Sequence, residues 1–470
     1  MTSTAATTKA EAKKVNTALV LTSLMLGAFA YGVLAVIIVP ALPLFEQVLH
    51  TDETGATWLL TAFFLSAAAA TALLGRMGDM FGKRRILLVT LGVLAVGTLI
   101  SAVSGSLAPQ IIARVLQGSA GGLLPLSFGI VRDELPHERV GAGIAGITGM
   151  ISLGGLGVVL PGLLIPHVSW HWLFWIPMIL TLIALVGTWL LVPESPVRHG
   201  GRVNLVNAAL MMGGITAVVI GVSEGSNWGW SSGKTLGLLL GGLAVCAIWV
   251  IAEVLSGNPV INMTLMRQRP VWTTNVFAFM SGAGMYGAFA VYPIFAQLPK
   301  TTGFAYGASM LHCGLYLLPF MALIGVASPF SGRLVARFSA VHVLVAGSLL
   351  TAIGFGYMGL WHQHPYDMMI SLGLAGFGFG LTLPALFTAV IHAVPPKNVG
   401  EVSGISVVLR FIGGVLATQV VASLITSNSD QGMPTVHGFT GSFWALAGFT
   451  VIGVIAAAIV PEHRAPNEGS

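Results

Sequence analysis

Residues 75–85 read Gly75-Arg76-Met77-Gly78-Asp79-Met80-Phe81-Gly82-Lys83-Arg84-Arg85 and lie between two long apolar stretches. A shorter version, Gly332-Arg333-Leu334-Val335-Ala336-Arg337-Phe338, recurs in the second half of the chain. Glycine permits a tight turn between two membrane helices, and the charge bias of membrane insertion holds basic residues in the cytoplasm. A repeated basic hairpin of this kind predicts a transporter built from two related halves.

The composition is that of a protein embedded in a membrane. Of the 470 residues, 55% are apolar and only 8% are charged, and 60 are glycines, which excludes an ordinary soluble domain. A helix needs about 20 residues to cross the hydrocarbon core. The predicted spans, about fourteen in all, lie at roughly 17–45, 56–76, 86–104, 107–131, 141–166, 170–192, 204–224, 234–255, 271–297, 308–332, 340–361, 368–391, 402–426 and 441–460. The expected fold class is an all-α polytopic membrane protein.

The basic residues predict the orientation of these helices. Apart from two arginines inside spans, the 21 Lys and Arg all fall on one side except Lys234 and Lys300. The positive-inside rule then puts both termini in the cytoplasm, which an even number of spans satisfies. Topology accounts for the net charge of +5, so the expected surroundings are the lipid bilayer of the cell membrane, and no nucleic-acid partner is expected.

Neither a cleaved signal peptide nor a cysteine site is expected. The first sixteen residues are polar, and the apolar stretch that follows is too long for a signal-peptide core, so it is the first membrane helix. Cys246 and Cys313 both fall inside predicted spans, which disfavours a disulfide framework or a zinc site. No cofactor and no resident metal are expected.

The segment 75–85 resembles the cytoplasmic loop between helices 2 and 3 of the major facilitator superfamily. In that family an Asp in the position of Asp79 braces neighbouring helix ends and latches one conformation. The resemblance therefore implies a conformational latch, which consists of Gly75, Asp79, Gly82, Lys83 and Arg84 together with Arg333 and Arg337 of the echo.

A second motif, Arg114-Val115-Leu116-Gln117-Gly118-Ser119-Ala120-Gly121-Gly122, falls in the fourth predicted helix. Arg114 and Gln117 share a helical face, and a guanidinium inside the hydrocarbon is costly unless it faces a cavity or a partner. The motif looks like the helix 4 Arg-x-x-Gln-Gly signature of the same superfamily, which implies a part in proton coupling at the central cavity. A structural role of Arg114 as a hydrogen-bond hub stays open.

Further landmarks resemble the fourteen-helix drug:proton antiporter family. They are Trp170-His171-Trp172-Leu173-Phe174-Trp175-Ile176-Pro177, Asn204 with Trp228-Gly229-Trp230, and Asn258-Pro259-Val260-Ile261-Asn262 before Arg267-Gln268-Arg269. The resemblance implies a major facilitator fold with two inserted central helices between six-helix halves. The expected divisions are a cytoplasmic tail 1–16, an N-terminal half 17–202, the insertion 203–255, a C-terminal half 256–461 and a tail 462–470.

The fifth predicted helix is rich in glycine, which permits close helix packing. Gly157, Pro161 and Gly162 match part of the antiporter pattern of the superfamily, although Leu160 replaces the glycine that usually precedes the proline. The resemblance therefore favours export. Packing alone is the alternative explanation for these glycines.

The coupling site departs from the family pattern. Leu34, Val36 and Val39 occupy the polar positions of helix 1, and no Asp or Glu falls in the middle of a predicted span. Arg114 and Arg410 are the embedded charges, and arginine stays protonated at physiological pH. His312 is the best embedded titratable group and is expected near the middle of its helix. The equally good alternative is that His312 is a neutral histidine, hydrogen-bonded within the core, that takes no part in coupling.

A cavity with cations and no fixed anion predicts a neutral or anionic amphiphilic small-molecule substrate. The family resemblance implies that this substrate is moved by proton-coupled efflux. Tyr286, Tyr316 and Gln419 are expected to line it. A gradient-independent facilitator for lipids or metabolites and a transport-dead sensor are the alternatives. The dispersed acids and histidines disfavour an enzyme. The family resemblance implies a monomer and a bacterial host.

One external loop has residues that are chemically suited to a metal. His362, His364 and Asp367 are closely spaced, but no further ligand lies nearby in the sequence. A flexible polar loop is therefore the favoured interpretation of this segment.

Overall fold

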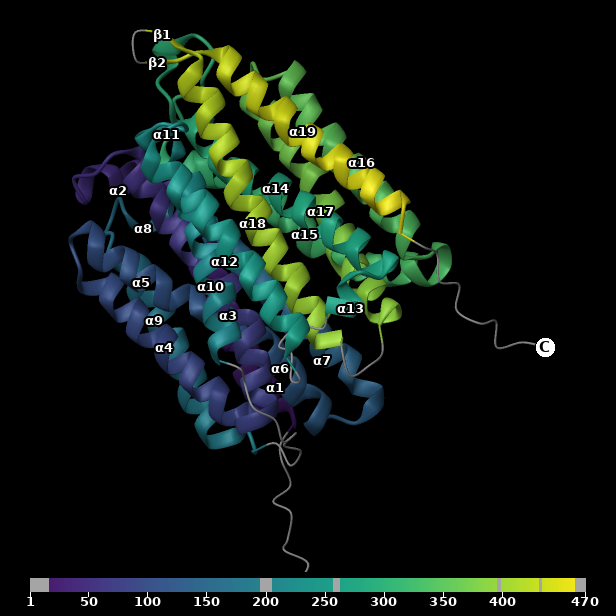
Figure 1. The fold of residues 1–470 in the computed structure, drawn as a ribbon. Coiled ribbons are helices and arrows are strands. Elements are labelled where there is room, and N and C mark those ends of the chain that lie inside the picture. Colours follow the sequence, from purple (N-terminus) through teal and green to yellow (C-terminus); the bar gives the residue numbers. More distant parts are fainter. Residues whose placement is uncertain (1–16, 195–204, 257–262, 395–398, 431–432, 461–470) are drawn as a thin grey trace, which may run out of the picture.

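The computed structural model describes residues 17–194, 205–256, 263–394, 399–430 and 433–460 (Figure 1). These residues form helices, apart from a two-residue antiparallel pair of strands, β1 (Ser429–Asp430) and β2 (Met433–Pro434). The N-terminal bundle consists of α1 (Thr17–Val36), η1 (Val39–Ala41), α2 (Leu42–Val48), α3 (Glu53–Phe81), α4 (Lys83–Val103), α5 (Leu107–Ser119), η2 (Ala120–Gly122), α6 (Leu123–Glu134), α7 (His137–Gly154), η3 (Gly155–Val159), α8 (Leu160–Leu164) and α9 (Trp172–Leu191). The central hairpin consists of α10 (Leu205–Ser223), α11 (Gly225–Trp228) and α12 (Gly233–Leu255). The C-terminal bundle consists of α13 (Met263–Met266), α14 (Arg269–Gln297), η4 (Lys300–Thr302), α15 (Met310–Phe338), α16 (Ala340–Leu360), α17 (Pro365–Ala393), α18 (Val399–Ser427) and α19 (Val436–Ala458).

The two bundles repeat one packing pattern. In the N-terminal bundle α1 packs on α7 and α9, α3 on α5, and α4 on α5 and α9. In the C-terminal bundle α14 packs on α18 and α19, α15 on α17, and α16 on α17 and α19. The same set of neighbours therefore recurs in the same chain order, as in other carriers built from internal repeats.

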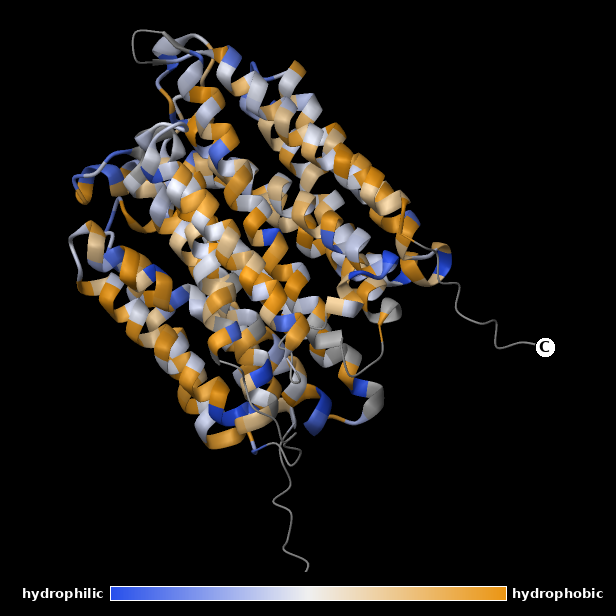
Figure 2. Cartoon of the chain, viewed as in Figure 1, coloured by the Kyte–Doolittle hydropathy of each residue, from blue (hydrophilic) through white to orange (hydrophobic). Residues whose placement is uncertain are grey.

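Twelve helical segments of the described chain are long and apolar enough to cross a membrane. The other two predicted spans fall within α3 and α10, whose apolar stretches, Gly55–Ala67 and Ala209–Val222, are shorter. Three of the twelve segments are broken internally, by η1, η2 and η3, and the breaks at η2 and η3 are rich in glycine. Hydrophobic residues occupy much of the length of the helices, and many of the most hydrophilic residues lie towards the helix ends (Figure 2).

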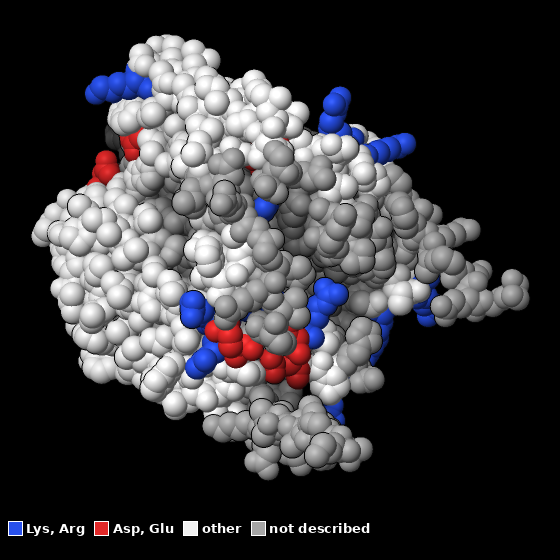
Figure 3. All heavy atoms as spheres, turned by 60° about the horizontal axis from the view of Figure 1, so that its bottom comes forward, with Lys and Arg blue, Asp and Glu red and all other residues white. Residues whose placement is uncertain are grey.

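The ends of the bundles differ in charge. We call the end where α3 joins α4 and α15 joins α16 the basic end, because Lys83, Arg84, Arg333 and Arg337 lie there. The opposite end, where α14 leads through η4 to α15, is the far end. Viewed towards the basic end, Lys and Arg flank one patch of Asp and Glu (Figure 3).

The two bundles contact each other at the far end. Gln297 of α14 donates to the carbonyl of Pro40 in η1 over 3.1 Å. A Cβ added to Gly162 of α8 would lie 2.2 Å from the Cα of Leu311 in α15, so the backbones touch there. At the basic end, by contrast, buried residues of the C-terminal bundle such as Val271, Leu344 and Ala385 form a core cluster drawn from that bundle alone.

The central hairpin lies along the seam between the bundles, because α10 packs on α12 and also on α3 and α18. A small cluster around Met211 joins it to the C-terminal bundle near the basic end through Met266 and Ile405. Asn207 of α10 donates to the buried carboxylate of Glu253 in α12 and ties the two helices together. Most of the other face of α12 is exposed.

Candidate functional site

Arg114 is completely buried in α5 and bonds to two other helices of the N-terminal bundle and to Gln117 of its own helix. Its Nε donates to the carbonyl of Leu59 in α3 over 2.9 Å, and its Nη1 donates to the carbonyl of Leu34 in α1 over 3.0 Å. The same Nη1 donates to Oε1 of Gln117 over 2.7 Å, and the ring centre of Phe63 lies 4.3 Å from Cζ. All of these partners are uncharged, so the contacts of Arg114 are those of a hydrogen-bond hub.

Gln117 extends this hub to α4. It shares a face with Arg114, as predicted, and its Nε2 donates to Ser101 Oγ over 3.0 Å and to the carbonyl of Gly97 over 3.3 Å. Glycine is needed at 118, because a Cβ there would lie 2.0 Å from the carbonyl oxygen of Phe63. The glycine next to Gln117 therefore brings α5 against α3, and the polar residues link both helices to α4.

Arg410 is the other embedded arginine, and its surroundings differ. It is the twelfth residue of the 29-residue helix α18, about 16 Å along the axis from the basic end. Its Nη2 lies 3.4 Å from Sδ of Met285 in α14, and its buried Nε has no hydrogen-bond partner. A Cβ on Gly282 would lie 1.9 Å from the carbonyl oxygen of Arg410, so α14 and α18 are in backbone contact beside it. A thioether is a weak acceptor, which leaves this guanidinium almost unsatisfied.

An aromatic row connects the two arginines across the bundle interface. Phe63, under Arg114, packs edge-on against Phe64, with ring centres 5.5 Å apart. Phe64 then contacts Phe411 and Tyr286 of the C-terminal bundle at 5.6 Å and 4.4 Å. Tyr286 and Phe411 stack on each other at 5.4 Å. We call Phe64, Tyr286 and Phe411 the aromatic bridge. Tyr286 thus lies at the interface between the bundles.

The structure does not place His312 where the sequence analysis expected it. Ser309 caps α15, and the helix runs from Met310 to Phe338, so His312 lies in its first turn. The side chain is exposed, and its Nδ1 lies 2.8 Å from Ser309 Oγ. The expected position near the middle of the helix, in a central cavity, is therefore wrong, because the helix begins only two residues before this histidine.

The other two expected lining residues lie away from Arg410. Tyr316 is half-buried near the far end of α15, where its ring meets Tyr306 edge-on at 6.2 Å. Gln419 is 8% exposed and follows Arg410 by more than two turns of α18. The structure therefore brings Tyr286 and Arg410 into one neighbourhood and leaves Tyr316 and Gln419 outside it.

The predicted latch residues form a compact turn in the N-terminal bundle. Gly82 has φ +103°, a conformation that favours glycine, and it ends α3 and caps α4. Lys83 Nζ lies 2.7 Å from Asp133 Oδ2 of α6, and Arg84 Nη2 donates to the carbonyl of Trp189 in α9 over 2.5 Å. Gly75 packs beside Pro125. The side chain of Asp79 lies outside the described part.

In the echo, Arg333 and Arg337 are exposed, and their guanidiniums lie 5.9 Å and 5.3 Å from the ring centres of Phe330 and Phe338. The two hairpins are thus similar in position, whereas within the described part of the chain the salt bridge at Lys83 has no counterpart at Arg333 or Arg337.

The three residues of the antiporter pattern lie at the bundle contact. Gly157 falls in η3 beside Val33 of α1, and Pro161 and Gly162 are buried in α8. A Cβ on Gly314 of α15 would lie 2.7 Å from the carbonyl oxygen of Val158. Glycines on both sides therefore permit α15 to meet η3 and α8 at backbone distance.

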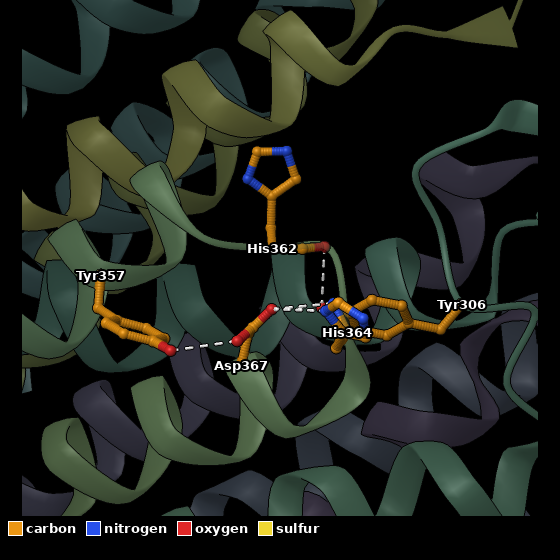
Figure 4. A network of polar contacts seen from close by, with 5 residues as sticks. All are labelled: Tyr306, Tyr357, His362, His364 and Asp367. Carbon is orange, nitrogen blue, oxygen red and sulfur yellow. Dashed lines mark hydrogen bonds and ion pairs between the residues drawn. The ribbon is translucent and has the colours of Figure 1, made fainter.

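The polar loop at the far end serves helix capping (Figure 4). Asp367 accepts from the backbone N–H of His364 over 2.9 Å and from the Tyr357 hydroxyl over 3.1 Å. Tyr306 donates to the carbonyl of His362 over 3.1 Å. The imidazole of His362 points away from His364 and Asp367, and the described residues include no cluster of three or more ligands suited to a metal.

Comparison with known proteins agrees with this architecture. A family model described as Major Facilitator Superfamily matches residues 24–322 and 276–470. The tetracenomycin C resistance and export protein of Streptomyces glaucescens is 26% identical over 455 residues, which cover 93% of this chain and 80% of that protein. The multidrug resistance protein Stp of Mycobacterium tuberculosis (strain CDC 1551 / Oshkosh) is 28% identical over 407 residues, covering 86% and 74%.

Solved structures show the same fold. The human organic anion transporter MFSD10 aligns with a TM-score of 0.64 at 17% identity, covering 94% of this chain and 99% of that one. The nucleoside transporter NupG aligns with a TM-score of 0.65 at 14% identity, covering 94% and 100%.

Fold and comparisons together define a multi-pass membrane transporter. The chain belongs to the Major Facilitator Superfamily, and the relatives named above are drug-resistance and export proteins rather than enzymes. The predicted family is confirmed on these grounds.

Sequence reasoning missed several residues of the interface. Met285 contacts Arg410, and Phe64 contacts Phe411, the residue after Arg410, but all three have the sequence character of ordinary apolar positions in a membrane helix. The sequence signal that could have indicated this interface was the aromatic residue Phe411 directly after the embedded Arg410. Trp58, which donates its indole N–H to Glu224 Oε1 over 2.6 Å, gave no signal because its partner lies 166 residues away.

Proposed function

We propose that the protein is a proton-coupled exporter of neutral or anionic amphiphilic small molecules. The observation that carries this proposal is the pair of embedded arginines, neither of which has a carboxylate partner among the described residues. Arg114 bonds to neutral groups, and Arg410 contacts a thioether. An embedded cation without a counter-ion disfavours a cationic ligand and favours an anionic one.

The relatives support an amphiphilic substrate. One is named for resistance to and export of tetracenomycin C, and another for multidrug resistance. The aromatic bridge supplies an apolar wall beside Arg410, as binding sites for such ligands usually have. An apolar body with an acidic or neutral polar group suits this combination.

The orientation follows from charge. The basic end is assigned to the cytoplasm by the positive-inside rule, so both termini lie there and the membrane is the cell membrane of a bacterium. On this assignment the bundles are closed on the external side. We further propose that α3 and α10 also cross the bilayer, which makes fourteen spans arranged as halves 17–202 and 256–461 around the insertion 203–255. A monomer is the proposed assembly.

The test is flux in proteoliposomes with an imposed pH gradient, using an anionic, a neutral and a cationic amphiphile of similar size. We expect gradient-driven movement of the first two and little movement of the cation. Preference for the cation would contradict the substrate class. Flux that ignores the gradient would indicate a facilitator, and absence of flux for every probe would favour a sensor.

A further inference from the structure

Arg114 and Arg410 are both embedded, and each has one buried guanidinium nitrogen without a partner, Nη2 in Arg114 and Nε in Arg410. They differ in how much of the rest of the guanidinium is already bonded. Arg114 already donates three hydrogen bonds and lies over the Phe63 ring, within a completely buried hub. Displacing those bonds would break a buried network and take the Arg114 donor away from Gln117 Oε1, which is costly. Arg410 has one long contact to a sulfur atom, and its Nε is buried without an acceptor.

An unsatisfied guanidinium inside a membrane protein is expensive, and an anionic ligand would offset that cost. Within the described chain no carboxylate forms an ion pair with Arg410, so no protein anion competes with a ligand for its guanidinium. Its planar fork of N–H groups matches a carboxylate or a sulfonate. Two parallel N–H···O hydrogen bonds would then fix the orientation of the bound acid.

The position of Arg410 is that of a substrate site. It lies near the middle of α18, and the next residue, Phe411, stacks on Phe64 of the opposite bundle and on Tyr286. The guanidinium contacts Met285, the residue before Tyr286, and Arg410 precedes Phe411, so Arg410 is next in sequence to one residue of the aromatic bridge and its guanidinium contacts the neighbour of another. The bridge lies on the boundary between the two bundles, which move relative to each other in alternating access.

Resting on the proposed function, we infer that Arg410 alone is the anion-binding residue of the substrate site. It takes the acidic group of an aromatic or otherwise planar amphiphile, and the aromatic bridge of Phe64, Tyr286 and Phe411 holds its apolar body. Arg114 holds the N-terminal bundle together and contributes nothing to the choice between an acid and its neutral analogue.

The test is equilibrium binding to the purified full-length protein in nanodiscs, with pyrenebutyrate and its methyl ester as fluorescent probes. These probes share the apolar body and differ in the charge. We expect the wild-type protein to bind the acid more tightly than the ester. Arg410→Gln should lower the affinity for the acid about ten- to hundredfold, the range for one hydrogen bond to a charged group, and leave that for the ester within about twofold.

Two further variants sharpen the result. Arg410→Lys keeps the charge and should retain part of the preference for the acid. Arg139→Gln removes an exposed cation near the start of α7 and should leave the preference intact. The inference is overturned if the wild-type protein binds the acid no more tightly than the ester, or if Arg410→Gln weakens both probes equally. Failure of the proposed function would appear separately, as absence of gradient-driven flux despite a preserved acid preference.

Discussion

Trp58 of α3 donates its indole N–H to the carboxylate of Glu224, 2.6 Å away, and thereby fastens the far end of the central hairpin to the N-terminal bundle. Glu224 follows α10 and is the N-cap residue of α11. The bond connects residues 166 positions apart in the chain. A hydrogen bond to a charged group contributes about 1.5–3 kcal/mol, which is the contribution that we expect of this bond to the attachment of the hairpin at that end.

Trp58→Phe should weaken the attachment of the hairpin while keeping an apolar ring in place. We expect a loss of about 1.5–3 kcal/mol in the free energy of unfolding, measured as a lower thermal midpoint in detergent. Trp272→Phe is the matched control, because Trp272 is an exposed residue of α14. Equal midpoints for the two variants would show that the bond to Glu224 contributes little.

Arg114→Lys should disrupt the hub although it preserves the charge. Lysine lacks the planar fork that reaches Leu34, Leu59 and Gln117 at once. Loss of two of these bonds costs about 3 kcal/mol or more, so the yield of monodisperse protein and the thermal midpoint should both fall. Arg410→Lys, tested beside it, should stay near the wild-type midpoint. A stable Arg114→Lys protein that has lost only its acid preference would reverse the roles of the two arginines.

Gly282→Ala should force α14 and α18 apart, because the added Cβ would lie 1.9 Å from the carbonyl oxygen of Arg410. Overpacking of this kind costs about 1–3 kcal/mol, read as a lower thermal midpoint. Gly325→Ala on α15 meets open space and should be neutral or stabilising by up to about 1 kcal/mol. The close contact between the helices is disproved if both alanine variants behave alike.

Gly162→Ala should open the far end, since its Cβ would collide with the backbone of Leu311. Cys313 lies two residues further along α15 and is completely buried, so it reports on this contact in a Cys246→Ser background. We expect several-fold faster labelling by a membrane-impermeant maleimide. Gly149→Ala, which meets open space on α7, should label like the parent, and equal rates in both variants would mean that Gly162 does not hold the bundles together.

His312→Gln should leave the pH dependence of transport unchanged, because His312 is exposed in the first turn of α15 and bonds only to Ser309. Glutamine retains hydrogen bonding but does not titrate. The measurement is flux against pH at a fixed gradient. A displaced pH profile would restore the coupling role that the sequence suggested for this residue.

Helix positions were predictable because hydrophobic length is a local property. The predicted spans 340–361 and 170–192 correspond to Ala340–Leu360 and Trp172–Leu191. The shared face of Arg114 and Gln117 followed from helical geometry alone. The embedded placement of Arg410 was likewise predictable from its apolar neighbours.

The surroundings of the arginines were not predictable, because they depend on contacts between distant helices. Met285 lies 125 residues from Arg410 in the chain, and Leu34 lies 80 residues from Arg114. Nothing in a single sequence distinguishes an arginine with three acceptors from one with a single sulfur contact. The misplaced His312 has a different cause. The predicted span 308–332 begins close to the observed start of α15 at Met310, so its bounds already put His312 near the helix start, and the expectation of a position near the middle did not follow from them.

The attachments of the central hairpin bear on how far the two bundles can rotate relative to each other. One of its ends is fastened to the N-terminal bundle through Trp58 and the other to the C-terminal bundle around Met211. A helical hairpin of fixed length that is attached to both bundles, at opposite ends, should limit how far the bundles can rotate relative to each other. Shortening the hairpin or weakening either attachment should therefore change the range of this rotation before it changes the affinity for the substrate.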